Sequence, residues 1–391
     1  MNDKPVFDYP LFAMGFRAFF ALAGLSALAL IALWNQMSQG AFHTDHYYAG
    51  TLWHGHEMLL GYATAVIAGF LLTAVRNWTG VQTVSPDQLA SLSFLWIYGR
   101  VTPFYSELLP DELIAALDVA FLPALAYFIG KPILKTGQIR NMLFIALLLL
   151  MSAGNVLIHA EVLGLTAGTA MMGLNLVVTV IVMMILVIAG RVFPFFTERG
   201  LTGVICIRNP GLDIAACGVS LAVLLALMMG LSGALLAVLA GAAVVLNGLR
   251  VSAWYNPRIW YVPLLWVLYV GYGWLIAGFA LVGLAAFGLI SAALALHAFT
   301  VGGIGILTLG MMARVALGHT GRALKASNVM AIAFVLINVA ALFRVFFPAL
   351  LPGWYNGFIL ASTYSWLAAF SLFAFYYAPV LTQPRIDGEP G

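Results

Sequence analysis

Two histidines and a glutamate stand together in the stretch His54-Gly55-His56-Glu57, at the start of a long apolar run. Ionisable side chains are costly at the edge of the membrane hydrocarbon, so their presence indicates a function. Imidazole binds iron and copper well, and a carboxylate such as Glu57 can orient an imidazole or pass protons. His54 and His56 are about 200° apart around a helix. We therefore expect two neighbouring centres, or one ligand and one supporting partner. A tight helix interface, typical of small residues, is the alternative.

His297 is a second candidate ligand. It lies near the middle of a later apolar run, and Gly302, Gly303 and Gly305 follow it. Glycines let another group approach the helix backbone closely, and neutral imidazole suits haem iron and copper. The position predicts a ligand. A hydrogen-bonded packing histidine and the proton relay of a carrier are the alternatives.

The remaining histidines lie in predicted loops or at the ends of apolar runs. His43 and His46 have a spacing that could hold copper or zinc, and a solvated loop is an equal alternative. His159 ends another run, with a weaker spacing for a metal site. His319 lies too far along its run to share the site of His297, and contact with lipid or phosphate is its alternative role.

Two arginines, Arg100 and Arg344, are predicted to end their apolar runs towards the outer side of the membrane. Haem carries two propionates, and the forked guanidinium group matches a carboxylate. The hypothesis is that these arginines hold outward-facing propionates of a haem that lies between the runs of His54 and His297. Ordinary snorkelling of the two side chains to the surface is the alternative.

The composition predicts an all-α, polytopic membrane protein. Of 391 residues, 63% are hydrophobic and 8% are charged, and the mean hydropathy is +1.02. A water-soluble fold needs more polar surface than this, and the apolar runs are long enough for helical spans. The net charge of +3 is no sign of nucleic-acid binding, and the two cysteines suggest neither a disulfide framework nor a zinc site.

About twelve spans are predicted, in a single membrane domain over residues 1–391 with no evident sequence repeat. Fifteen of the seventeen lysines and arginines fall on one side if both termini are cytoplasmic, which sets the predicted orientation. Polar residues inside the spans, such as Asp118 and Asn155, could relay protons or bond neighbouring helices. The predicted spans are 16–36, 52–76, 89–105, 112–130, 140–160, 168–190, 211–230, 232–250, 259–280, 284–312, 326–347 and 355–379.

Several stretches, spread in order over most of the chain, carry a resemblance to a known family. They are Phe12–Arg17, Trp53–Met58, Ala68–Ala74, Asn77–Gly80, Gly190–Thr197, Leu296–His297 and Leu317–Arg322. Through them the sequence resembles the NnrS family, bacterial membrane proteins of the nitric-oxide response that contain haem and copper.

The resemblance implies b-type haem and copper as cofactors, protection against nitrosative stress as the role, and the bacterial inner membrane as the location. Its motifs mark His54, His56, Glu57, His297 and His319 as candidate site residues.

The sequence thus predicts a haem and copper protein that binds or converts nitric oxide or a related small molecule, or limits its damage. His297 and one of His54 and His56 would bind haem, the other would serve copper together with a loop histidine, and Glu57 is the catalytic candidate. Turnover would make it a nitric-oxide-linked oxidoreductase. The alternatives are a haem, copper or iron–nitrosyl binding protein without turnover, and a twelve-span secondary transporter with His297 and Asp118 as coupling residues. The lipid bilayer is its surroundings, and nucleic acid is not a partner.

Overall fold

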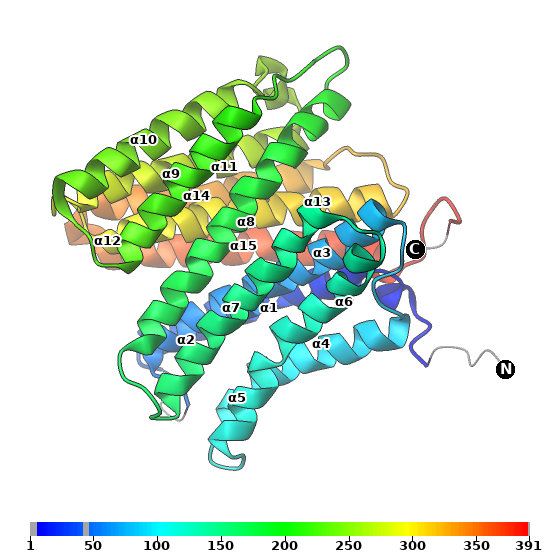
Figure 1. The fold of residues 1–391 in the computed structure, drawn as a ribbon, viewed down its shortest axis with the longest axis horizontal. Helices are drawn as coiled ribbons and strands as arrows, with labels where there is room; N and C mark the ends of the chain where they lie inside the picture. The colour runs from blue at the N-terminus through cyan, green and yellow to red at the C-terminus, as the bar shows by residue number, and fades with distance from the viewer. Residues whose placement is uncertain (1–5, 42–46, 390–391) are drawn as a thin grey trace. The chain divides into compact units, whose positions relative to one another are not determined.

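The computed structural model describes residues 6–41 and 47–389, and all regular structure in these ranges is helical (Figure 1). Eleven helical segments in them are long and apolar enough to cross a membrane, which confirms the all-α membrane fold. They are α1 (Gly15–Ser38), α2–η2–α3 (Gly50–Thr79), α5–α6 (Asp111–Lys135), η4–α7 (Ile139–Val162), α8 (Thr169–Gly200), α9 (Pro210–Met228), α10 (Gly233–Ser252), α11 (Pro263–Ala285), α12–η6–α13 (Ala292–His319), α14 (Asn328–Leu350) and η7–α15 (Pro352–Thr382).

The span predicted over 89–105 corresponds to a shorter helix, α4 (Pro86–Val101), which the 3-10 turn η3 (Thr102–Tyr105) continues. Its 16 residues rise about 24 Å, less than the roughly 30 Å hydrocarbon layer. The helix begins at a capping box, in which Ser85 and Gln88 each accept a hydrogen bond from the other's backbone N–H. A serine before a proline and a glutamine three residues later is a typical signal for such a start.

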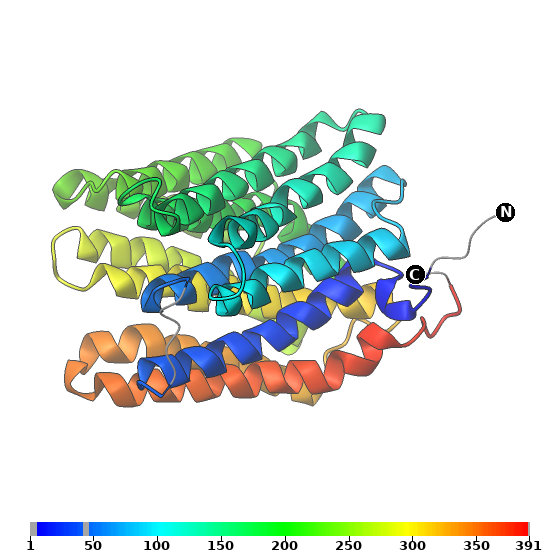
Figure 2. The ribbon, with the colours of Figure 1, turned by 90° about the horizontal axis from the view of Figure 1, so that it is seen from below.

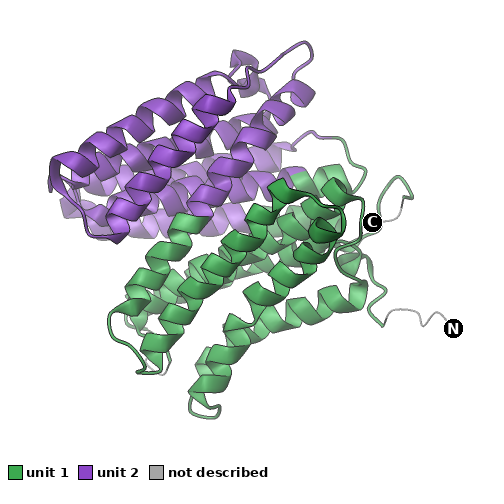
Figure 3. Cartoon of the chain, viewed as in Figure 1, with its two compact units in different colours: residues 1–180, 315–323, 373–391 green, residues 181–314, 324–372 purple. Residues whose placement is uncertain are grey.

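The chain divides into two compact units (Figure 3). Unit 1 consists of residues 1–180, 315–323 and 373–391, and unit 2 of residues 181–314 and 324–372. The predicted single membrane domain stays a prediction.

Within unit 1 the start of α1 and the end of α15 (Tyr355–Thr382) lie side by side (Figure 2). Buried Arg17 joins them, because its guanidinium donates to the carbonyl oxygens of Leu381 at 3.1 Å and Gln383 at 2.7 Å. These carbonyls at the helix end have no partner inside the helix, and a cation there is favourable. Arg17 therefore holds the end of α15 against the start of α1.

Two membrane helices change from α to π geometry directly after a histidine. Helix α2 (Gly50–His56) is followed by the π-helix η2 (Glu57–Ala63), and α12 (Ala292–His297) by the π-helix η6 (Ala298–Gly305). The chain then continues as α3 (Thr64–Thr79) and α13 (Ile306–His319). Short π segments are rare and frequently lie at functional sites.

The two interrupted helices also correspond in sequence, with a constant offset of 241 residues. The offset relates His56 to His297, Gly61 to Gly302, Gly69 to Gly310 and Thr79-Gly80 to Thr320-Gly321. In each, one glycine permits close packing on the preceding long helix. A Cβ at Gly69 would lie 2.8 Å from Phe20 of α1, and one at Gly310 would lie 2.8 Å from Val267 of α11. The structure thus reveals a short internal repeat that was not evident from sequence.

Candidate metal centre

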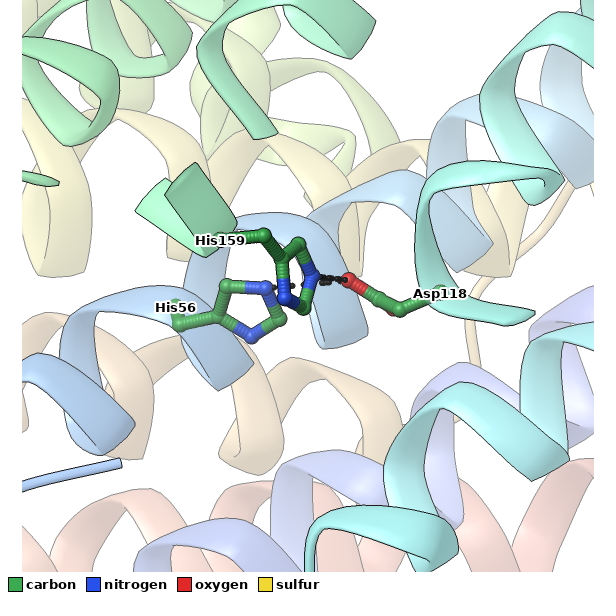
Figure 4. A group of neighbouring side chains, drawn as sticks. All are labelled: His56, Asp118 and His159. Atoms are coloured by element: carbon green, nitrogen blue, oxygen red, sulfur yellow. Dashed lines mark hydrogen bonds and ion pairs between the residues drawn. The ribbon is translucent and has the colours of Figure 1, made fainter. Parts of the chain in front are cut away.

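Three side chains from different helices converge inside unit 1: His56 at the end of α2, Asp118 on α5 (Asp111–Val119) and His159 on α7 (Met142–Val162). Figure 4 shows both imidazole rings turned towards the carboxylate. Asp118 Oδ2 lies 3.1 Å from His56 Nε2 and 2.9 Å from His159 Nε2. The exposed fraction of each of these three residues is 4% or less. They form a group that could bind a metal ion.

Close helix packing brings Asp118 to this position. Gly99 of α4 lies against α5, and a Cβ there would be 2.5 Å from Asp118 Oδ1 and 3.3 Å from its Cα. On the other side, a Cβ at Gly154 of α7 would be 2.9 Å from the backbone oxygen of Gly173 on α8. Only residues without a side chain allow these backbones to approach so closely.

Two more buried side chains, Tyr48 and Asn155, face the same atoms. The Tyr48 hydroxyl lies 3.0 Å from His56 Nε2 and 3.3 Å from His159 Nε2. Asn155 Oδ1 lies 3.1 Å from His56 Nε2, and its amide donates to Asp118 Oδ2 at 2.8 Å. Burial, and then the charges of nearby carboxylates, raises the pKa of Tyr48 well above its usual range, so without a metal the hydroxyl stays protonated.

The outer nitrogen of each imidazole also has a partner. Glu57 Oε1 lies 3.0 Å from His56 Nδ1, and a carboxylate only accepts, so Nδ1 of His56 carries a proton. Asp118 Oδ2 faces Nε2 of the same ring at 3.1 Å, so without a metal His56 donates from both nitrogens as an imidazolium. The Tyr47 hydroxyl lies 2.7 Å from His159 Nδ1 and can accept a hydrogen bond from it. Partners of this kind orient metal-binding imidazoles and leave the Nε2 lone pair for the ion.

The inner atoms gather several lone pairs when both imidazoles are neutral, the form in which histidine binds metals. Two Nε2 lone pairs, Asp118 Oδ2 and Asn155 Oδ1 then meet, and the donors are the Tyr48 hydroxyl and the Asn155 amide. Such a gathering of lone pairs is favourable around a cation. Two donors about 2.1 Å from one ion and at right angles to each other are about 3.0 Å apart, close to the separations seen here. The geometry therefore suits a metal ion.

The charge of the cluster supports the same interpretation. Buried Arg100 of α4 forms ion pairs with Asp118 Oδ1 and with Glu57 Oε1, the latter at 3.4 Å. One guanidinium and two carboxylates leave a formal charge of −1 away from water, and either a protonated His56 or a bound cation offsets it. Among the described residues, Glu57 Oε2 and Arg100 Nε have no hydrogen-bond partner. The role of Arg100 towards a haem propionate stays a prediction.

Of the site residues predicted from sequence, His56, Glu57 and Arg100 lie together in the structure. His54 makes a different contact. The His54 ring stacks on Trp34, with ring centroids 4.4 Å apart and planes 16° apart. His54 and His56 thus contact different partners, as their spacing on a helix predicts.

Two other predicted residues, His297 and Arg344, meet inside unit 2. His297 Nδ1 lies 2.7 Å from the backbone oxygen of Ala293, which places the proton on Nδ1. Arg344 donates to His297 Nε2 at 3.0 Å and to the Tyr355 hydroxyl at 3.3 Å. His297 has the tautomer of a ligand, with a guanidinium beside its lone pair. Haem ligation by His54 or His297 stays a prediction.

The last predicted histidines are apart from both groups. Asn77 Nδ2 lies 3.3 Å from His319 Nε2, near the loop that follows α13. His43 and His46 lie outside the described residues.

Sequence reasoning missed most of the cluster. From sequence, Asp118 and Asn155 are isolated polar residues in predicted spans, His159 is a weak candidate, and Tyr47 and Tyr48 are unremarked loop residues. The available signal was the cost of burying polar groups in a membrane, which requires partners for each of them. Nothing in the sequence says which partners they are.

A comparison with protein families finds one whose model, described as NnrS protein, matches residues 10–385, nearly the whole chain. No curated protein matches the chain.

Proposed function

The chain belongs to the NnrS family and is a multi-pass membrane protein, and from this we propose that it is a haem and copper protein of the nitric-oxide response. In this proposal His56, Asp118 and His159 bind copper, and the protein binds or converts nitric oxide or limits the damage it causes. Its predicted place is the bacterial inner membrane, with both termini in the cytoplasm.

The observation that carries the proposal is the convergence of His56 Nε2 and His159 Nε2 on one oxygen of Asp118. Imidazole nitrogens suit copper, iron and zinc, and oxygen donors complete such sites in many proteins. Copper in this position would supply a redox-active centre that nitric oxide can reach. Because nitric oxide is small and uncharged, burial among apolar helices does not keep it away.

The chain's own residues hold the donors in place. Glu57 contacts Nδ1 of His56 and keeps a proton on that nitrogen. The Tyr47 hydroxyl contacts Nδ1 of His159 in the same way. Arg100 holds Asp118 through Oδ1, which leaves Oδ2 for the two imidazoles. Loss of such outer partners typically costs about 10–100-fold in metal affinity.

His297 and Arg344 would hold the haem. The Nδ1 proton of His297 is engaged by a backbone oxygen, so its Nε2 presents a lone pair that suits haem iron. Arg344 lies beside that lone pair and would pair with a propionate of a bound haem. Haem would supply a second redox centre and a binding position for nitric oxide.

Metal analysis of the purified full-length protein tests the proposal. Wild type should carry copper and show a Soret band, and His56→Ala and His159→Ala should each lose copper. His319→Ala is the matched control, because it removes a histidine outside the cluster. Copper retained in both cluster variants would overturn the assignment of the site.

Nitric-oxide electrode measurements with a reductant then separate turnover from binding. Consumption of nitric oxide by wild type supports an oxidoreductase. Haem and copper without consumption support a binding protein, and absence of both cofactors would favour a transporter.

A further inference from the structure

Tyr48 lies just before α2, and its side chain is buried, with an exposed fraction of 1%. Its hydroxyl faces the inner nitrogens of both histidines, at 3.0 Å from His56 Nε2 and 3.3 Å from His159 Nε2. These are the same two atoms that face Asp118. The hydroxyl oxygen thus shares the place where the imidazole lone pairs converge.

The neighbouring Tyr47 shows that this position is specific. Tyr47 is also buried, but its hydroxyl lies 2.7 Å from His159 Nδ1, on the outer edge of that ring. One tyrosine therefore supports an imidazole from outside, and the next reaches the inner nitrogens. Two adjacent residues with the same side chain take different positions around one site.

The geometry points to Tyr48 as a fourth ligand of the ion, through its phenolic oxygen, in addition to His56, Asp118 and His159. The inference rests on the proposed function, since it presupposes that a metal ion binds this cluster. It assigns a donor set of two imidazole nitrogens, one carboxylate oxygen and one phenolate oxygen.

The separations of the four donor atoms agree with a single ion. Four of the six separations among them are 2.9, 3.0, 3.1 and 3.3 Å. Donors about 2.0–2.1 Å from an ion are about 3.0 Å apart at right angles and about 3.3 Å apart at tetrahedral angles. These four separations therefore match the distances between ligands of a single ion.

The charge of the buried groups favours phenolate with a divalent ion. With both imidazoles neutral as ligands, Arg100, Asp118 and Glu57 sum to −1, and a phenolate at Tyr48 makes the sum −2. A divalent ion then gives a neutral site, which is the least costly state inside a membrane. When the ion binds, the phenolic O–H bond breaks, the metal–oxygen bond forms and the proton leaves to water. No electron is transferred, so no oxidant is needed.

Copper(II) titration of the purified, metal-depleted full chain tests this inference. Wild type should bind one Cu²⁺ with a phenolate-to-copper charge-transfer band in the visible spectrum and phenolate ring modes in resonance Raman. Tyr48→Phe should lose the band and weaken copper binding by about tenfold or more. Tyr47→Phe removes an outer partner of His159 and should weaken copper binding by about 10–100-fold, but at saturating copper it should keep the band because its hydroxyl contacts the outer nitrogen. Tyr98→Phe, at an exposed tyrosine of α4, is the control that should change neither the affinity nor the band.

Ring-deuterated tyrosine in the wild-type protein gives a second measurement that does not depend on a variant folding. The Raman modes should shift if a tyrosine is the ligand, and the Tyr47→Phe protein should shift identically. Bound copper without phenolate modes, or a band that survives in Tyr48→Phe, would overturn the role of Tyr48. Failure of wild type to bind copper, or binding unchanged in His56→Ala, would instead overturn the proposed function.

Discussion

Asp118 contacts both histidines and Arg100 at once, so replacing it with asparagine should affect stability and metal binding together. The change keeps the shape of the side chain and removes its charge. Arg100 is then left buried with Glu57, whose Oε1 lies 3.4 Å away. The two imidazoles lose the oxygen on which they converge.

The stability cost follows from the broken ion pair. Removing one partner of a buried pair costs about 3–5 kcal/mol, and the remaining contact of Arg100 with Glu57 favours the lower end. A loss of about 3 kcal/mol corresponds to a fall in Tm of about 6–12 °C for a unit of roughly 200 residues such as unit 1. Native stability of about 5–15 kcal/mol leaves the variant mostly folded.

The assay has two readouts on the detergent-solubilised protein: the apparent Tm without metal, and the copper affinity. Copper affinity should fall by more than 100-fold, since loss of an outer partner alone costs about 10–100-fold. Asp111→Asn is the matched control, because it makes the same change at the start of α5. It should shift Tm by little and leave copper binding intact.

The double variant Arg100→Gln/Asp118→Asn separates the two effects. It removes the unpaired guanidinium and should regain part of the lost stability. The interaction free energy between the two substitutions should be about 0.5–3 kcal/mol. It should not regain copper. An Asp118→Asn protein with the Tm and copper affinity of wild type would show that this carboxylate does not join the ion pair to the metal site.

Three further predictions concern helix packing at the cluster, the contact of Arg344 with haem, and stabilisation by copper. Gly99→Ala should destabilise by about 1–3 kcal/mol and weaken copper binding, because its Cβ would meet Asp118; Gly241→Ala, where a Cβ meets nothing within 4 Å, should do neither in the same Tm and copper measurements. Arg344→Leu should lower haem content, read from the pyridine haemochrome, and leave copper unchanged; unaltered haem would contradict a propionate contact. Removal of copper by a chelator should lower the Tm of wild type, and added copper should raise it again as its concentration increases. The Tm of His159→Ala should not depend on copper.

Hydropathy alone determined the membrane class and most helix positions. Backbone polar groups in lipid must be hydrogen-bonded within the chain, so an apolar run of about 20 residues folds as a membrane-spanning helix. The bounds of the segment around 89–105 were harder to predict, because α4 ends at Val101 and a 3-10 turn continues it. The boundaries of such a short helix depend on its neighbours, which the local sequence does not contain.

The local sequence also indicated where chemistry was to be expected, at His54-Gly55-His56-Glu57, and predicted that its two histidines face different ways. Helical rotation per residue is a local property. The partners are set by how the helices pack: Asp118 is 62 residues from His56, and His159 is 41 residues from Asp118. Helices of similar apolar composition can pack in many orders, so only the folded chain shows that Gly99 lets Asp118 approach and that Tyr48 reaches both imidazoles.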